Sequence, residues 1–197
     1  MAAFNSFAKR LKQLFYVIVT LAAFQPAAAH EITPAIIDLS LTPGQSFRLS
    51  MEVNLEALMA ELGSGHSDTA EAENSGEYDR LRALSAAELR SEFDAFAPRL
   101  HAGLFVDLDG QRAKTLVDQV DIPATGDLDL PRESKLVIAG SLPRGVQAFR
   151  WSWDTAFGAA VIRQRLDEGG IGYTGYLTGG ASTDAIAVPQ KSWWQLW

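Results

Sequence analysis

The fold class is indicated most clearly by residues 47–55, which read FRLSMEVNL. Apolar side chains occupy every second position of this stretch, and the positions between them are polar or charged. Because successive side chains of a strand point to opposite faces of a sheet, the spacing predicts a strand with one buried face. Residues 35–41 alternate less regularly, and the sequence TPGQ at 42–45 is typical of a turn, so the two stretches together predict a β-hairpin.

Short apolar stretches separated by turn residues follow along the chain. Residues 104–108 alternate up to Asp109-Gly110, a dipeptide typical of two-residue hairpin turns, and the partner strand is predicted to run through residues 116–120. Further strands are predicted at 135–139, 149–153 and 160–166. This pattern predicts a mainly β fold, specifically an immunoglobulin-like antiparallel β-sandwich.

A helical insertion into the sandwich is predicted between about Leu55 and Pro98. Leucines and a methionine at helical spacing follow Leu55 and end at Gly63, and Ser85 with Glu88 forms a capping box that starts a second helix. Residues 63–76 contain no large apolar side chain, which predicts a loop. The expected organisation is a leader at 1–29, a sandwich domain at 30–188 and a tryptophan-rich tail at 189–197.

The first 29 residues have the order of a secretory signal peptide. Lys9, Arg10 and Lys12 precede an apolar run from Leu14 to Phe24, and three alanines end the segment. The apolar run is short of the about 20 residues that a membrane-spanning helix needs, so cleavage after Ala29 is favoured over a retained anchor. We therefore expect a periplasmic protein whose mature chain begins at His30.

Composition narrows the classes of function. The chain has a formal net charge of −7, a poor match to a nucleic acid surface, and it contains no cysteine, which excludes disulfides, thiolate metal sites and cysteine nucleophiles. No motif of a serine hydrolase or zinc protease is present, and we expect a protein that is not an enzyme. The glycine pattern at 170–175 matches a dinucleotide fingerprint by letter, but it lacks the helix and acidic residue that this fingerprint requires, so we expect a strand edge and no nucleotide.

The amino end of the mature chain is a candidate metal site. After cleavage, His30 would offer both a free amine and an imidazole to a transition metal such as Cu, Ni or Co. His101 and Glu31 are candidate further ligands, and His66 and Asp38 are less favoured ones. The alternative is that the terminal His30-Glu31 pair is only what processing leaves.

Two aromatic segments need a partner surface. Phe149, Trp151 and Trp153 share one face of a predicted strand, which favours a place in the core over a stacking platform for a ligand. The tail is different because Trp193, Trp194 and Trp197 follow a proline at the chain end. It is predicted either to fold back on the sandwich or to bind a partner protein or the membrane interface, where tryptophan is enriched.

Several of these features resemble one family. A leader ending in Ala29-His30-Glu31, the aromatic strand 149–151 and the late sequence YLTGG at 176–180 are similar to the extracytoplasmic domain that accompanies HupE/UreJ-type membrane permeases of proteobacteria. The resemblance implies an accessory role beside a permease for nickel or cobalt, with His30 and Glu31 as the matching site residues. In this family the domain is either fused to membrane helices or exported separately, and the end of this sequence at Trp197 favours the separate form.

Overall fold

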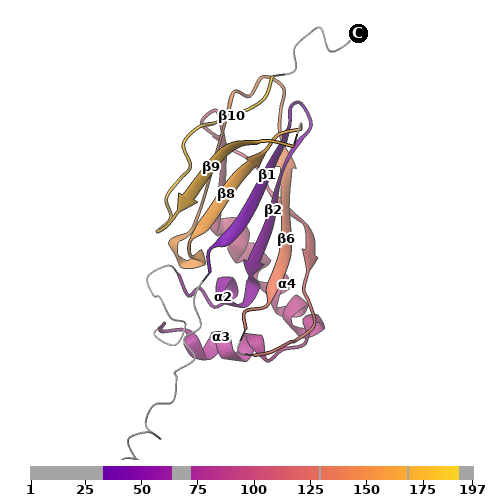
Figure 1. Ribbon diagram of the computed structural model, residues 1–197, viewed down its shortest axis with the longest axis vertical. Helices are drawn as coiled ribbons and strands as arrows, with labels where there is room; N and C mark the ends of the chain where they lie inside the picture. The colour runs from indigo at the N-terminus through magenta and orange to yellow at the C-terminus, as the bar shows by residue number, and fades with distance from the viewer. Residues whose placement is uncertain (1–32, 64–71, 129, 168, 191–197) are drawn as a thin grey trace, which may run out of the picture.

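The computed structural model describes residues 33–63, 72–128, 130–167 and 169–190 (Figure 1). The architecture is mainly β, as the alternating patterns predict, with strands arranged in two open sheets. The leader, His30, Glu31, His66 and the three tail tryptophans lie outside the described residues.

The larger sheet has six strands in the order β5-β6-β2-β1-β8-β9. The predicted hairpin is confirmed: β1 (Ala35–Thr42) pairs antiparallel with β2 (Ser46–Asn54), and Leu39 lies opposite Leu49. The other members are β5 (Leu116–Asp121), β6 (Glu133–Ser141), β8 (Ala160–Arg165) and β9 (Ile171–Leu177). The glycine pattern at 170–175 falls mostly on β9, which is an edge strand as expected.

The smaller sheet has four strands in the order β10-β7-β3-β4. Its members are β3 (Leu104–Leu108), β4 (Gln111–Arg112), β7 (Ala148–Trp153) and β10 (Ile186–Ala187). All of its strand pairs are antiparallel, and the register of β3 on β7 places Val106 opposite Trp151.

One strand pair departs from the purely antiparallel prediction. β1 pairs parallel with β8, in a register that joins Asp38 to Arg163. Alternation along a strand indicates which side chains are buried, but it contains no information on strand direction, so the sequence pattern did not distinguish the two arrangements.

A second difference concerns the strand that follows Asp109-Gly110. The hairpin forms, but only β4 pairs with β3; the chain then crosses through residues 113–115 to the other sheet, where β5 pairs with β6. The prediction of one continuous partner strand through residue 120 was therefore wrong. The segments that form β4 and β5 both have strand-like composition, and their alternation does not indicate that they belong to different sheets.

The α-helices of the described residues gather at one end of the sheets, and β10 lies towards the other end (Figure 1). They are α2 (Leu55–Met59), α3 (Ser75–Arg82) and α4 (Ala86–Gly103). The capping box is confirmed, because the Glu88 amide donates to the Ser85 hydroxyl and the Glu88 carboxylate accepts from the Ser85 amide. A 3-10 turn, η2 (Thr155–Phe157), follows β7.

Helix α4 continues past the proline at which we expected it to end. Pro98 lies inside the helix and removes one backbone donor, at a cost of about 3 kcal/mol for an interior position. Buried side chains on both sides of it, Phe93 and Leu100, extend one apolar stripe across the proline. Burial of this stripe offsets the missing hydrogen bond, so the helix ends only at Gly103.

The core lies between the facing sides of the two sheets. Phe149, Trp151 and Trp153 are all buried, which confirms the prediction that the aromatic strand packs in the core. The rings of Phe47 and Phe149 meet edge to face with centroids 5.5 Å apart and so join the two sheets. The Trp153 indole donates to the Gly158 carbonyl at 3.0 Å, which satisfies its buried N–H group.

A buried ion pair fixes the helical end to the larger sheet. Glu56 on α2 is fully buried, and its Oε1 lies 2.6 Å from Nε of Arg132, in the segment that leads into β6. The same guanidinium donates to the carbonyls of Leu84 and Leu81, at 3.1 and 3.4 Å, beyond and within the last turn of α3. One arginine thereby joins two helices and a strand.

Within the four described ranges, no helix is long and apolar enough to cross a membrane.

Candidate functional site

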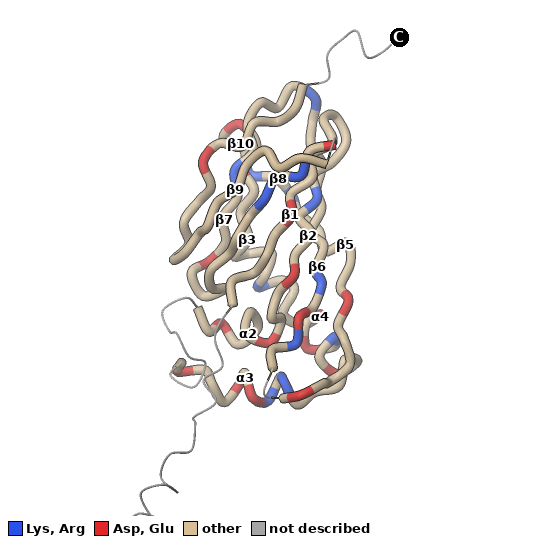
Figure 2. Tube along the Cα trace, in the orientation of Figure 1, with Lys and Arg blue, Asp and Glu red and all other residues tan. Residues whose placement is uncertain are grey.

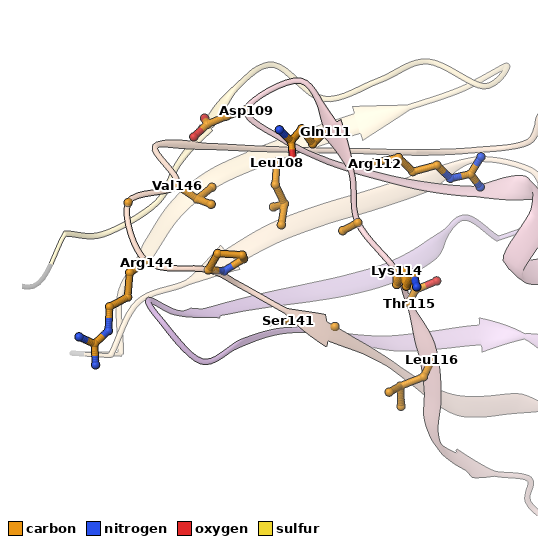
Figure 3. Close-up of a pocket in the computed structure, with 14 residues that line it drawn as sticks. Leu108, Asp109, Gln111, Arg112, Lys114, Thr115, Leu116, Ser141, Arg144 and Val146 are labelled. Carbon is orange, nitrogen blue, oxygen red and sulfur yellow. The ribbon is translucent and has the colours of Figure 1, made fainter.

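A groove of about 690 Å³ lies in the described part of the chain, where the two sheets separate at one edge (Figure 3). One wall is the β3–β4 hairpin together with the crossover at 113–115, and the other is the end of β6 with the loop that leads to β7. The groove therefore lies between strands that belong to different sheets. We refer to it below as the sheet-edge groove.

The hairpin turn on one wall depends on two residues with positive φ. Asp109 has a φ of 52° and Gly110 a φ of 88°, the combination that a two-residue primed turn requires. Asp107 supports the turn by accepting the Gly110 amide at 3.0 Å. Together with the pairing of β3 with β4, this hydrogen bond confirms the hairpin turn predicted at Asp109-Gly110.

Asp109 also joins the two walls of the groove. Its carboxylate accepts the amides of Gln147 and Ala148, both at 2.9 Å, and its own amide donates to the Ala148 carbonyl at 3.2 Å. These three bonds hold the hairpin against the start of β7. They fix the width of the sheet-edge groove at this end.

A close backbone approach shapes the middle of the groove. Gly140 on β6 faces the Phe47 ring and the crossover, and a Cβ atom at this position would meet the ring and lie 2.6 Å from the Lys114 carbonyl oxygen. Only a residue without a side chain allows the crossover to pass this close to β6. Gly140 thus determines the path that separates β4 from β5.

The lining combines apolar side chains with two free cations. Leu108, Leu116 and Val146 line the groove, and Leu116 is 53% exposed. Lys114 and Arg144 also line it, and neither has an ion-pair or side-chain hydrogen-bond partner among the described residues. In a chain with a net charge of −7, this is a local concentration of unpaired positive charge on an apolar surface.

Arg112, the third cation of the lining, has a structural role. Its guanidinium lies 4.1 Å from the centre of the Phe105 ring and donates to the carbonyls of His101, Ala102 and Leu104 at 3.1 to 3.3 Å. These carbonyls lie at the carboxyl end of α4, where a cation satisfies groups that the helix leaves unpaired. Arg112 is therefore committed to the fold rather than free for a ligand.

His101, a predicted metal ligand, is half-buried beside the same crossover. Its Nδ1 lies 3.1 Å from the Thr115 hydroxyl, and a hollow of about 370 Å³ is lined by His101 together with Arg112 and Lys114. Two cations in the same hollow oppose the binding of a metal cation there. Within the described part of the chain, no three His, Cys, Asp or Glu side chains are grouped so that they could hold a metal ion.

Asp38, the less favoured oxygen ligand, is engaged by two arginines on the outer face of the larger sheet. Arg163 Nε and Arg165 donate to its two carboxylate oxygens at 2.8 and 3.0 Å, and both arginines belong to β8, along which Figure 2 shows basic positions. Partial burial acts to raise the pKa of Asp38, but the hydrogen bonds from Arg165 and Arg163 outweigh it and hold the pKa below its ordinary value. Both oxygens are thus used within the fold.

A second polar cluster lies at the helical end. Arg99 on α4 bridges Glu61 and Asp154, at 2.6 and 2.9 Å, and lies over the Phe157 ring at 4.7 Å. The pKa of Asp154 is below its ordinary value, chiefly because the carboxylate accepts the Ala156 amide and then because it is bonded to Arg99. The cluster connects α2, α4 and η2, and we assign it to stability.

The sheet-edge groove was not predicted from the sequence. The strand prediction joined residues 111 and 120 into one element, which leaves no space between the sheets at this edge. The available signal was the adjacent apolar pair Leu116-Val117, which breaks the alternation just after the crossover. Five predicted site residues lie outside the described residues: His30, Glu31, Trp193, Trp194 and Trp197.

Neither the models of protein families nor the curated proteins include a match to this chain.

Proposed function

We propose that this chain is an exported, periplasmic accessory module that binds a HupE/UreJ-type membrane permease and acts in the handling of nickel or cobalt. The observation that supports a binding role is the sheet-edge groove, where Lys114 and Arg144, which have no ion-pair partner among the described residues, adjoin apolar side chains on an accessible surface. Export is supported by the leader sequence, and the permease by the resemblance at residues 29–31, 149–151 and 176–180. We assign the module a binding rather than a catalytic role.

The proposed permease contact lies at the end of the sandwich where β10 and the groove are found. The chain passes from there to Trp193, Trp194 and Trp197, residue types that are enriched both in protein interfaces and at the membrane surface. For the fold we propose an immunoglobulin-like sandwich in which the parallel pair β1–β8 is a local variation.

The permease contact is tested by photo-crosslinking in cells that also produce a HupE/UreJ-type permease encoded beside this protein. A photoreactive residue replaces Gln111 on the groove wall, and a matched one replaces Thr174 on the exposed edge strand β9. We expect an adduct with the permease from position 111 and not from position 174. Equal adducts, or none from position 111, contradict the assignment of this surface, and unchanged nickel and cobalt uptake after deletion of the gene contradicts the accessory role.

A second candidate is a periplasmic metal-binding protein that uses the amine and imidazole of His30 with Glu31 and His101. The position of His30 directly after the predicted cleavage site favours it. Copper titration of the mature protein is compared with a form that has one additional residue before His30. Tight binding only in the mature form supports the candidate, and affinity that is unchanged in a His101→Ala variant removes His101 from the site.

A further inference from the structure

We propose that the sheet-edge groove binds an extended peptide segment in which acidic side chains alternate with apolar ones, and that an extracytoplasmic loop of the permease supplies this segment. The choice of the permease as the source rests on the proposed function. The chemistry of the segment does not, because it is set by three properties of the groove: its charge, its apolar floor and the free strand edges that border it.

The groove is positively charged in a protein that carries a net negative charge. Its charged lining consists of three cations and one anion, namely Arg112, Lys114, Arg144 and Asp109. Asp109 accepts backbone amides and Arg112 donates to the end of α4, so both are used within the fold. Lys114 and Arg144 have no ion pair or side-chain hydrogen bond among the described residues. In a chain with a formal net charge of −7, two such cations at one place favour a ligand that carries acidic groups.

The position of Arg144 is set by the turn between β1 and β2. A Cβ atom at Gly44 would lie 2.7 Å from Cγ of Arg144, so the stem of this arginine packs directly on the turn. Gly44 has a φ of 76°, a conformation that glycine adopts without strain. Arg144 and Lys114 come from opposite walls of the groove and lie at different points along it (Figure 3). A segment that lies between the walls can therefore present acidic side chains to both cations.

The floor between the walls is apolar. Leu108 and Val146 point into the space between the hairpin and the β6–β7 loop, and Leu116 lies farther along it (Figure 3). Leu116 is 53% exposed, so it has apolar surface available to a ligand. Since successive side chains of an extended segment point to opposite sides, a segment in the groove directs every second side chain to this floor. We expect those side chains to be apolar and the acidic ones to alternate with them.

Two strand edges without partners border the groove. β4 pairs with β3 on one side only and is the last strand of the smaller sheet in the described part of the chain. β6 pairs with β2 as far as Ser141, but its pairing with β5 begins opposite Ala139, so Gly140 and Ser141 have no described strand on that side. A segment that adds to such an edge gains main-chain hydrogen bonds. A hydrocarbon chain cannot form them, which favours a peptide over a fatty acid as the occupant.

The test measures the binding of a defined peptide to the full mature chain. The probe is a fluorescein-labelled peptide of sequence VEVEVEV with blocked ends, and binding is followed by fluorescence anisotropy. We expect saturable binding in the micromolar range that weakens as salt is added, because Lys114 and Arg144 are exposed to solvent. The matched peptide VKVKVKV, with the same apolar residues and the opposite charge, should bind at least about tenfold more weakly.

Variants of the protein locate the site. Lys114→Gln and Arg144→Gln should each weaken binding of the acidic probe by about two- to fivefold, the effect of losing one exposed charge pair. Lys135→Gln is the matched control and should leave the affinity unchanged. Lys135 is also an exposed cation without an ion-pair partner in the described ranges, and it lies on β6, six residues before Ser141 and outside the groove.

Modified probes test the strand edge. Two versions of VEVEVEV are N-methylated at alternate residues, one in each phase, so that each loses the main-chain donors along one side. At least one of them should bind more weakly than the unmodified probe, because a paired strand uses the donors of one side. Equal binding of all three probes overturns strand pairing in the groove.

The remaining outcomes separate the groove from its partner. Failure of the acidic probe to bind, equal affinity for the lysine peptide, or a loss with Lys135→Gln as large as that with Lys114→Gln overturns the proposal for the groove. Peptides that cover the extracytoplasmic loops of the permease then compete with the probe. Displacement by one loop supports the permease as the source, and no displacement by any loop overturns it. Failure of the proposed function is distinguishable from these results, because the adduct from position 111 and the uptake of nickel and cobalt are measured without the probe.

Discussion

The buried pair Glu56–Arg132 is the contact whose loss should destabilise the fold most. Arg132→Met removes the charge partner that the described residues provide for a carboxylate with no exposed surface, and it also removes donors to the Leu84 and Leu81 carbonyls. Removing one member of a buried ion pair costs about 3–5 kcal/mol, because the remaining charge is left without water or partner. Against a typical unfolding free energy of about 5–15 kcal/mol, this is a large fraction of the stability.

The assay is urea unfolding followed by circular dichroism, with free energies from the midpoint and slope of each curve. The double variant Glu56→Leu/Arg132→Met should recover most of the loss, because a buried apolar pair of similar size is often as stable as the ion pair. Arg90→Met, which breaks the exposed pair with Asp94, is the control and should cost less than about 1 kcal/mol.

Two results would refute the reasoning. One is a cost below about 1 kcal/mol for Arg132→Met, the range of an exposed pair. The other is a double variant whose loss equals the sum of the two single losses, since residues that interact directly should not be additive. If Arg132→Met does not fold, Arg132→Lys keeps the charge but loses the planar arrangement of donors, and it should lie between the wild type and the methionine variant.

Three further predictions concern the groove walls and the outer sheet face. Asp109→Ala should speed hydrogen exchange of the Gln147 and Ala148 amides while exchange in β1 stays unchanged, and Asp109→Asn, which tolerates positive φ, should have a smaller effect. Gly140→Ala should lower the unfolding free energy by about 1–3 kcal/mol through overpacking, whereas Gly126→Ala, where a Cβ meets nothing within 4 Å, should be neutral in the same urea assay. Asp38→Asn should destabilise the protein at pH 7. The pKa of Asp38 in the folded protein lies below its unfolded value of 3.8. The ionised carboxylate therefore stabilises the fold above pH 3.8, and this stabilisation is lost as the pH falls through the folded pKa. The difference in stability between wild type and Asp38→Asn should therefore vanish in acid, and a difference that persists there contradicts the assigned cause.

The sequence predicts individual strands better than their arrangement. The hairpin 35–54, the aromatic strand and the capped helix follow from local spacing, because alternation and capping are properties of neighbouring residues. Which strand pairs with which depends on residues that are far apart in the sequence. Nothing local to β1 indicates that it pairs parallel with a strand more than a hundred residues later, and nothing local to Arg112 and Leu116 indicates that the chain changes sheets between them.

The candidate site follows the same division. Residue chemistry identified His101 and Asp38 as possible metal ligands. Only the fold reveals that the Asp38 carboxylate is hydrogen-bonded to Arg163 and Arg165. It also reveals that His101 lines a hollow together with two cationic side chains. The groove depends on Gly140, whose role arises from a contact with a distant crossover. Such a contact between remote segments has no sequence pattern of its own.

The parallel pairing of β1 with β8 also has a consequence for how the protein folds during synthesis. β1 is among the first strands made, yet its second neighbour in the sheet is at residues 160–165. Until those residues leave the ribosome, one edge of β1 has no native partner. Pairings between such distant segments are slow to form, on the order of milliseconds to seconds for β-rich domains. The unpaired edge of β1 is therefore open to mispairing until β8 has been made and has paired with it. Binding to a chaperone during this time would protect the edge.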